Sequence, residues 1–386
     1  MQRVISEINL DALEHNFNII KNRTKSKIMC VVKANAYGHG VAQIAPFLDK
    51  LGADAFAVAD IDEGIELRNC GVKKPCLVLG YSDEPEKAVE YDIMPAIFDL
   101  NTAQKLSHAA VKCGKTAKIH IALDTGMSRI GFNINNMNDS GEVIEQIKSI
   151  NKLPGIIIDG IFSHFTTADE EDTRYTDRQF NLFMDFVDRI EASGIKIPTK
   201  HISNSAATMM YPNMHLDMVR PGIILYGLAP SEYLNKKNFG FMPVMTLKAK
   251  VSRVENLSEG ICVGYGNTFV TPHPMRVATV GIGYADGYFR TFSGKACAVY
   301  SGHKVKNIGR ICMDQCMFDV SSVNNIGVGD YLTLFGTDLT ADSLAEVAGT
   351  IGYELVCAVG RRVPRIYLQH GKKCSEQNYL LENIVR

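Results

Sequence analysis

Short apolar runs alternate with helical stretches over the first two-thirds of the chain. The runs predict strands near residues 28–32, 54–59, 75–80, 93–98, 117–123, 156–161, 199–203 and 218–224. Between them, segments such as 41–48 and 177–192 repeat apolar residues at helical spacing. Alternating strands and helices predict parallel βα units, and eight strands close a (β/α)8 TIM-type barrel. A doubly wound sheet built from the same units is the alternative.

The pattern changes near residue 232, where closely spaced segments begin to alternate apolar and polar residues. These segments are 245–254, 275–282, 296–300, 304–309, 317–320 and 331–335. Turn-forming residues separate several of them, which predicts a mostly antiparallel β domain. We expect a polar connection at 235–238 and a short helix at 341–349, capped by Thr340 or Asp342.

The chain is therefore predicted to be an α/β protein of two domains. Residues 9–234 form the barrel, and residues 1–8 with 235–386 form the mostly β domain. The opening strand at 4–8 fits either domain by its own pattern, and it is assigned to the second.

Composition excludes several classes of function. The 386 residues carry a formal net charge of −1, with no basic stripe for nucleic acid and no polybasic cluster for a membrane surface. No apolar stretch is long enough to span a bilayer, and the N-terminus lacks the apolar core of a signal peptide. Ten scattered cysteines fit reduced thiols in a cytoplasmic protein. Cys312 and Cys316 have no companion pair nearby, so no metal site is expected.

Lys33 is the most informative residue of the barrel segment. It stands at the C-terminal tip of the first predicted strand, before the turn-forming stretch 34–40. Partial burial lowers the pKa of an amine, which suits Schiff-base chemistry. A lysine that merely extends from the strand end into solvent explains the local pattern equally well.

Polar residues follow several other predicted strands, and barrel enzymes place their chemistry at these strand ends. They are Tyr37, Asp124 to Arg129, Ser163, His164, Asn204, Ser205, Arg220, Gly222 and Ile223. Ser205 and the amides of Gly222 and Ile223 fall where barrels commonly bind phosphate. A phosphate site beside a rim lysine predicts pyridoxal phosphate. Taken singly, Arg220 fits an ordinary ion pair, and His164 fits an ordinary core or loop histidine.

Three glycine-rich segments of the second domain also carry candidate chemistry. They are 263–266, 283–287 and 309–315, and they contain Tyr265, Tyr284, Cys312, Met313 and Asp314. Glycines on both sides of a tyrosine place its ring on an exposed turn. Taken alone, Tyr265 is better explained as an ordinary turn tyrosine, and Asp314 is equally well explained as a turn aspartate.

Together these motifs resemble those of the alanine racemase family, which are fold-type III pyridoxal phosphate enzymes. The resemblance begins with 32–40, Val-Lys-Ala-Asn-Ala-Tyr-Gly-His-Gly, and covers almost the whole chain. It includes 124–129, 163–170, 204–207, 219–223, 226–231, 264–266, 283–287, 309–315, 353–354 and 362–365. So many motifs in the same order make the resemblance specific.

The resemblance implies a role for each candidate residue. Lys33 would carry the cofactor and act as one base, and Tyr265 would be the opposing base, reaching across from the partner of a head-to-tail homodimer. The implied cofactor ligands are Lys33, Tyr37, His164, Ser205, Arg220, Gly222, Ile223 and Tyr353. Arg129 and the Met313 amide would bind the substrate carboxylate, with Cys312, Asp314 and Tyr284 in support.

The implied activity is interconversion of L- and D-alanine, which supplies D-alanine for peptidoglycan. Inversion of a carbon centre needs a base on one face and an acid on the other, and Lys33 and Tyr265 would occupy these faces. The reference pKa of tyrosine is about 10, so Tyr265 needs positive charge or hydrogen-bond donors nearby. The resemblance also implies that Arg220 contacts the pyridine nitrogen of the cofactor. Because arginine can only donate hydrogen bonds, Arg220 favours the unprotonated form of that nitrogen.

One position departs from the family pattern. Many members have a lysine, often carbamylated, seven residues before the arginine that matches Arg129, and here that position is Ala122. Alanine offers neither charge nor hydrogen bond. We expect a carboxylate from elsewhere, an anion such as chloride, or water to take the place of that group.

Other functions stay open at this point. A serine or broad-specificity racemase of the same fold is the nearest alternative, although a bulky Tyr353 leaves little room beyond a methyl group. A barrel-type amino-acid decarboxylase would place a carboxylate where Arg220 stands. A pyridoxal-phosphate-binding homeostasis protein would lack the second domain that carries Tyr265.

Overall fold

The eight strands predicted for the barrel form a closed parallel sheet in the computed structural model, which describes residues 2–135 and 140–382. They are β2 (Lys27–Val31), β3 (Ala55–Val58), β4 (Cys76–Val78), β5 (Met94–Ile97), β6 (Ala117–Asp124), β8 (Ile156–Phe162), β9 (Lys200–His201) and β10 (Met218–Val219). The order is β10-β2-β3-β4-β5-β6-β8-β9, and a short strand β7 (Phe132–Asn133) pairs with β6. Backbone hydrogen bonds from Asp217 to Lys200 and from Arg220 to Ser203 join the two end strands. The doubly wound alternative is therefore wrong.

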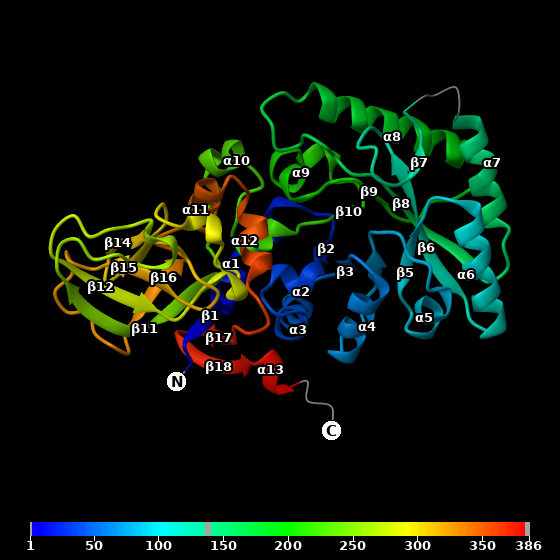
Figure 1. Cartoon of the computed structure of the whole chain (residues 1–386). Coiled ribbons are helices and arrows are strands. Elements are labelled where there is room, and N and C mark those ends of the chain that lie inside the picture. The colour runs from blue at the N-terminus through cyan, green and yellow to red at the C-terminus, as the bar shows by residue number, and fades with distance from the viewer. Residues whose placement is uncertain (1, 136–139, 383–386) are drawn as a thin grey trace.

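Helices surround this sheet (Figure 1). They are α1 (Leu10–Arg23), α3 (Val41–Leu51), α4 (Ile61–Asn69), α5 (Pro85–Glu90), α6 (Leu100–Lys112), α7 (Ser140–Asn151), α8 (Arg174–Ala192) and α9 (Ser205–Met210). With helices outside and packed side chains inside, the strands are buried on both faces. Ile28, Met29, Cys30 and Val31 are accordingly all buried. This burial explains why the barrel strands read as continuous apolar runs.

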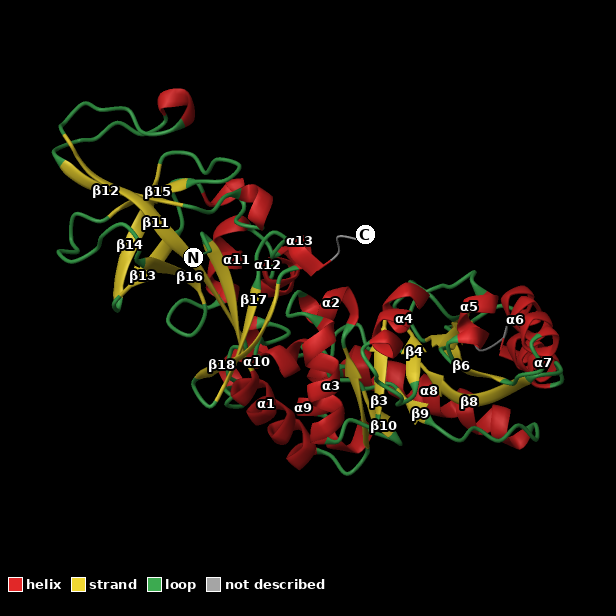
Figure 2. Cartoon of the chain, turned by 90° about the horizontal axis from the view of Figure 1, so that it is seen from below, coloured by secondary structure: helices red, strands yellow, loops and turns green. Residues whose placement is uncertain are grey.

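The second lobe is a mostly antiparallel sheet beside the barrel (Figure 2). Its strands are β1 (Val4–Asn9), β11 (Met245–Leu257), β12 (Met275–Val280), β13 (Cys297–Tyr300), β14 (His303–Ile308), β15 (Cys316–Asp319), β16 (Tyr331–Phe335), β17 (Arg365–Gln369) and β18 (Lys372–Gln377). The order is β12-β15-β14-β13-β16-β11-β1-β17-β18, and β12 also pairs with β11. Among the described strands of this second sheet, only β1 and β17 pair in parallel.

Short helices accompany the second sheet: α10 (Glu232–Lys237), α11 (Ala341–Ala348), α12 (Gly352–Ala358) and α13 (Tyr379–Glu382). Thr340 is the cap of α11, since its side chain accepts a hydrogen bond from the Ser343 amide at 3.1 Å. No helix within the described ranges has the length and apolar character needed to cross a bilayer.

Two expected elements differ from the structure. The strand expected at 218–224 ends at Val219, because Pro221 and Gly222 interrupt it, and a 3-10 helix, η2 (Ile223–Tyr226), follows. The polar connection expected at 235–238 is largely the end of α10. That helix forms because Ser231 caps its first turn by accepting from the Leu234 amide.

Candidate active site

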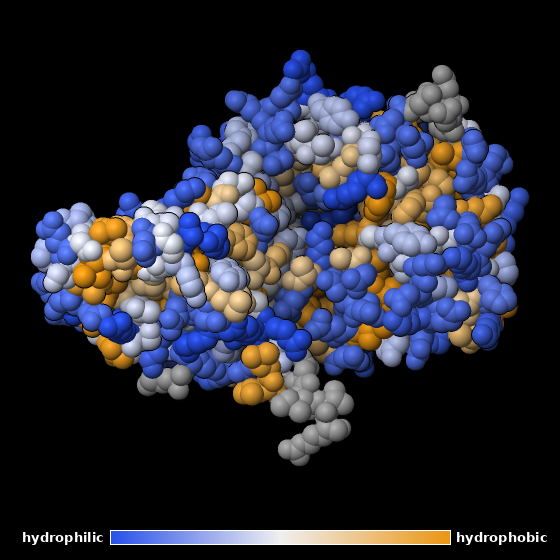
Figure 3. Space-filling view, viewed as in Figure 1, coloured by the Kyte–Doolittle hydropathy of each residue, from blue (hydrophilic) through white to orange (hydrophobic). Residues whose placement is uncertain are grey.

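A cavity of about 480 Å³ lies at the carboxyl end of the barrel strands. This size is within the usual range for small-molecule sites, about 300–1,000 Å³. Figure 3 shows a hollow on the face where the two lobes meet. The cavity is lined by these sequence-predicted residues: Lys33, Tyr37, Arg129, His164, Ser205, Arg220, Gly222, Ile223 and Tyr353. Eight of the nine belong to the barrel, and Tyr353 comes from α12.

The segment that follows Lys33 has an unusual backbone. It is a short turn, α2 (Lys33–Tyr37), in which Ala34, Asn35, Ala36 and Tyr37 have φ between 52° and 56°. The left-handed conformation costs about 1–2 kcal/mol for each residue that has a Cβ. Contacts from elsewhere must therefore hold this turn.

Two groups of contacts hold it. Glu63 accepts hydrogen bonds from the amides of Ala34 at 2.6 Å and Ala59 at 2.7 Å. From β17, the buried Arg365 donates two hydrogen bonds to the Gly38 carbonyl, at 3.0 and 2.9 Å. Other donors of Arg365 reach the carbonyls of Val359, Gly360 and Val363. The barrel and the second lobe thus together fix the turn that presents Lys33 and Tyr37 to the cavity.

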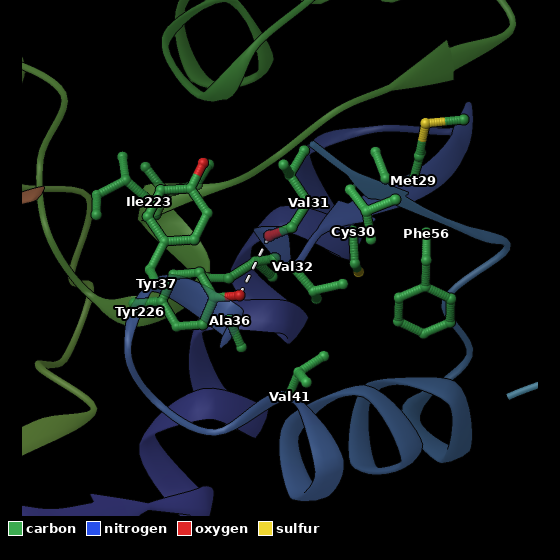
Figure 4. Packing of buried hydrophobic residues seen from close by; sticks show 14 of the residues in the cluster. Met29, Cys30, Val31, Val32, Ala36, Tyr37, Val41, Phe56, Ile223 and Tyr226 are labelled. Atoms are coloured by element: carbon green, nitrogen blue, oxygen red, sulfur yellow. Dashed lines mark hydrogen bonds between the residues drawn. The ribbon is translucent and has the colours of Figure 1, made fainter. Parts of the chain in front are cut away.

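Tyr37 is set by aromatic packing. Its ring lies 5.0 Å from that of Tyr226, whose hydroxyl donates to the Val31 carbonyl at 3.1 Å (Figure 4). A Cβ built on Gly222 would lie 2.6 Å from the Tyr37 hydroxyl oxygen, so only glycine fits beneath it. Ser205 Oγ accepts from the Gly222 amide at 2.8 Å. Tyr37, Ser205 and Gly222 therefore lie together in one part of the cavity wall.

The cavity is cationic. Burial, and next the charge of Arg129, lower the pKa of Lys33, while Glu63 partly opposes the shift. Among the described residues, the Arg129 guanidinium has no hydrogen bond or ion pair, and it is exposed toward the cavity. A lowered pKa leaves more of the Lys33 amine neutral, which is the nucleophilic form.

Arg220 is buried and held by fixed acceptors. Its Nη1 donates to His201 Nδ1 at 2.9 Å, and its Nη2 donates to the Ser163 carbonyl at 2.8 Å. His164 Nδ1 lies 3.2 Å from the same Nη2. Within the part of the chain that the structure describes, Nε has no acceptor, and Arg220 is one of the residues that line the cavity. That N–H group can therefore serve a ligand.

Because arginine only donates hydrogen bonds, Arg220 fixes the tautomers of His201 and His120. His201 Nδ1 must accept, so its proton is on Nε2, which donates to His120 Nδ1 at 2.8 Å. Burial, followed by the nearby Arg220, holds the pKa of His164 and of His201 well below the usual range. Burial also lowers the pKa of Arg220 to about 9, with a contribution from Arg129.

The second-lobe candidates are not in this cavity. Tyr265, Tyr284 and Met313 are 70%, 43% and 53% exposed, and none of them lines it. Asp314 forms an ion pair with Arg362 at 2.6 Å, and Cys312 is half-buried. One chain therefore brings together the barrel residues and Tyr353, and it leaves the other second-lobe candidates on its surface.

Ala122 is buried in the cavity wall beside Leu123. A neighbouring carboxylate, Asp124, is occupied by the amides of Gly126, Met127 and Ser128 at 2.9–3.0 Å. It is therefore committed to holding its own loop.

Sequence reasoning missed several residues that shape the site. Asp169 lines the cavity, and Glu63, His201 and Arg365 hold the groups that do so. Arg365 lies far along the chain from the turn it binds, so no local pattern connects them. His201 carried a usable signal, because it is a polar residue inside the barrel strand predicted at 199–203.

Family models of the alanine racemases match most of the chain. The N-terminal domain model covers residues 8–230 and the C-terminal domain model covers residues 244–367. The alanine racemase of Methanococcus maripaludis is 46% identical over 371 residues, which are 94% of this chain and 98% of that protein. That of Clostridium tetani is 43% identical over 388 residues, which are 98% and 99% of the two chains.

Solved structures agree. The alanine racemase of Clostridium difficile 630 has a TM-score of 0.94 at 40% identity, covering 98% of this chain and 99% of that one. The alanine racemase of Bacillus anthracis with bound L-Ala-P has a TM-score of 0.92 at 33% identity, covering 98% of each.

The closed barrel, its cationic cavity with a lysine, and the β lobe beside it define a two-domain barrel enzyme. Both family models match it, and the chain belongs to the alanine racemase family. It is accordingly an amino-acid racemase, and the cofactor of this family is pyridoxal 5'-phosphate. The predicted resemblance, fold class and cofactor are confirmed. The match to the C-terminal domain model excludes the barrel-only binding protein.

Proposed function

We propose that this chain interconverts L- and D-alanine by a two-base mechanism in which Lys33 and Tyr265 face opposite sides of bound pyridoxal 5'-phosphate. The main supporting observation is Lys33, a partly buried amine with a lowered pKa in a cationic cavity. The test is circular dichroism of L-alanine incubated with the purified holoenzyme. Loss of the optical signal is expected, and an unchanged signal would overturn the proposal.

The residues of the cavity fit the cofactor. Lys33 would hold its aldehyde carbon, and the Arg220 Nε–H would meet the pyridine nitrogen, with His164 supporting the ring. The phosphate would be held by Tyr37, Ser205, Gly222, Ile223 and Tyr353, which line one cavity. The glycine beneath the Tyr37 hydroxyl keeps the space in this wall that a Cβ would fill. When bound, the cofactor withdraws electrons from the substrate α-carbon and makes its proton acidic.

The chain's own groups then move the proton. On one face Lys33 Nζ takes or returns it, and on the other face the Tyr265 hydroxyl does so. Arg129 would bind the substrate carboxylate together with the Met313 amide. The lowered pKa of Lys33 suits this role, since the neutral amine is the form that accepts a proton.

Tyr265 requires a second chain. In one chain it is 70% exposed and outside the cavity. We therefore propose a head-to-tail homodimer in which Tyr265, Tyr284, Cys312, Met313 and Asp314 of each chain complete the cavity of the other. The units that pair in this way are residues 9–234, and residues 1–8 with 235–386, of which 1, 136–139 and 383–386 lie outside the described residues.

An anion or water beside Ala122 would orient Arg129, whose guanidinium has no carboxylate partner among the described residues. Crystals soaked in bromide test this proposal. An anomalous peak between Ala122 and Arg129 is expected, and a site filled only by apolar side chains would overturn it.

The proposed biological role is the supply of D-alanine for peptidoglycan in the cytoplasm. Expression of the chain should restore growth without added D-alanine to a bacterium that lacks its own racemase. Continued dependence on D-alanine, despite active protein in the cell, would contradict this role.

Alanine is favoured over serine because the bulky Tyr353 lines the cavity. Its ring would leave little room for a side chain larger than a methyl group. Discrimination by one small group is worth only about 1–3 kcal/mol, so slow serine turnover is expected. The measurement is kcat/KM for L-alanine and for L-serine. A higher value for serine would reverse the assignment.

A further inference from the structure

Asp286 is a fully buried carboxylate in the second lobe, outside the cavity. Arg3, just before β1, binds it with two nitrogens: Nη2 lies 2.6 Å from Oδ1, and Nη1 lies 2.9 Å from Oδ2. The Gly283 amide donates to Oδ2 at 3.1 Å. A bidentate arginine and a backbone amide hold this side chain in one orientation.

The same cluster reaches a second loop. Arg362 Nε lies 3.7 Å from Asp286 Oδ1, and its Nη2 donates to Asp314 Oδ1 at 2.6 Å. Arg3 Nη1 also donates to the Gly281 carbonyl at 2.7 Å. Asp286 thus lies at the centre of an ion-pair network in which Arg3 and Arg362 connect the loops 281–288 and 312–315.

These two loops are bonded directly to one another. The Tyr284 amide donates to the Cys312 carbonyl, and the Ala285 amide to the Met313 carbonyl, each at 3.1 Å. A Cβ on Gly283 would lie 2.1 Å from the Cys312 carbonyl oxygen, so the backbones are in close contact. A shift of one loop must therefore move the other, including Tyr284 and Met313.

We propose that Asp286 is a positioning residue that sets the Met313 amide and Tyr284 for the active site of the partner subunit, and not for that of its own chain. This inference rests on the proposed shared site. Its physical basis is that groups that bind substrate must be held to within about 0.5 Å. Met313 itself is 53% exposed, so packing around it does not hold its loop in place.

The variant that tests this is Asp286→Asn, which keeps the size of the side chain. Its amide replaces one acceptor by a donor, which then faces Arg3 or the Gly283 amide. In the homodimer we expect kcat/KM for alanine to fall tenfold or more, mainly through KM, because the Met313 amide would bind the substrate carboxylate. The cofactor absorbance should stay unchanged, since Lys33 and its turn are in the barrel.

Mixed dimers with two affinity tags separate the two chains. When Lys33→Ala is on one chain and Asp286→Asn on the other, the one site that keeps Lys33 receives its loops from the chain with intact Asp286. We expect about half of the wild-type kcat and a wild-type KM. When both changes are on one chain and the other is wild type, the site that keeps Lys33 receives the altered loops, and KM should rise as in the Asp286→Asn homodimer.

Two controls make the outcomes distinct. Asp330→Asn removes a carboxylate that also holds a loop of the same lobe, through the Gly327 amide and the Tyr300 hydroxyl, and KM should not change. A Lys33→Ala and Tyr265→Phe mixed dimer should recover about half of the activity, and failure there overturns the shared site itself. Recovery there, combined with equal KM values in the two Asp286 arrangements, overturns the role of Asp286.

Discussion

The barrel and the second lobe prepare their parts of the site in opposite ways. Arg220 is 2% exposed and Tyr37 and Ser205 are 8% exposed, and all three are fixed by hydrogen bonds or ring contacts inside one cavity. Tyr265 and Met313, on the second lobe, are 70% and 53% exposed. The barrel half is organised by burial within one chain, whereas the second-lobe half is an exposed surface that, in the proposed homodimer, acts against another chain.

This contrast indicates how the two halves should respond to change. Damage to the barrel half should affect cofactor binding within the same chain. Damage to the second-lobe loops should spare the cofactor and affect the reaction at the partner's site.

Lys33→Ala should have the largest effect. It would remove the proposed cofactor attachment and one of the two proposed bases, so racemisation should fall by at least about 10⁴-fold, together with the visible absorbance band. Absorbance spectra and chiral chromatography measure both losses. Lys27→Ala, at the other end of β2, should keep both properties.

Tyr265→Phe tests the opposite half. Loss of an acid–base group costs about 10²–10⁴-fold in rate. The absorbance band should remain, because the barrel half is intact. A fully active Tyr265→Phe enzyme would refute the two-base assignment and remove the reason for a shared site.

Arg365→Lys tests how the second lobe supports the barrel in the same chain. Arginine makes five hydrogen bonds to backbone carbonyls here, and lysine has only three donors. Buried carbonyls would lose partners, so the free energy of unfolding should fall by about 3 kcal/mol. The affinity for pyridoxal 5'-phosphate should also fall as the Lys33 turn relaxes. Arg253→Lys, at an exposed position, provides the control in urea unfolding and cofactor titration.

Acid should destabilise the barrel. Burial lowers the pKa of His120 to about 4 and that of His39 to about 3. The unfolded chain therefore binds protons that the folded chain does not, and the free energy of unfolding falls as pH drops below about 6.5.

His120→Asn measures the contribution of one such group. The asparagine oxygen can still accept from His201 Nε2, so the hydrogen bond is kept while the titrating group is removed. Between pH 7 and pH 5 the loss of stability should be smaller than in the wild type by about 2 kcal/mol. Urea unfolding at the two pH values provides the measurement. His303→Gln, exposed on β14, should leave the pH dependence as it is.

Sequence patterns predicted the strands well where burial makes them apolar on both faces. They failed where individual residues interrupt a strand or cap the start of a helix. The strand at 218–224 was shortened by Pro221 and Gly222, and the connection at 235–238 became helix because Ser231 caps it. Neither effect changes the periodicity of apolar residues, so periodicity alone could not detect it.

The residues of the candidate site likewise divide into those that the sequence predicted and those that it missed. The barrel residues follow strand ends, and parallel strands bring these ends to one rim, so their order along the chain predicted their proximity. Glu63, His201 and Arg365 were missed because they act on other side chains or on the backbone. Their partners are distant in sequence, and only folding shows which carbonyl or nitrogen they meet.

By itself the sequence determined the architecture, the family and the side chains available for catalysis, because local periodicity and ordered motifs are properties of the chain. The tertiary structure alone decided how Lys33 is presented. Four consecutive left-handed residues are unfavourable on their own, and they persist because Glu63 and Arg365 hold them from the barrel and from the other lobe. The lowered pKa of Lys33 has the same origin, since it depends on burial and on Arg129, which reaches it only in the closed barrel.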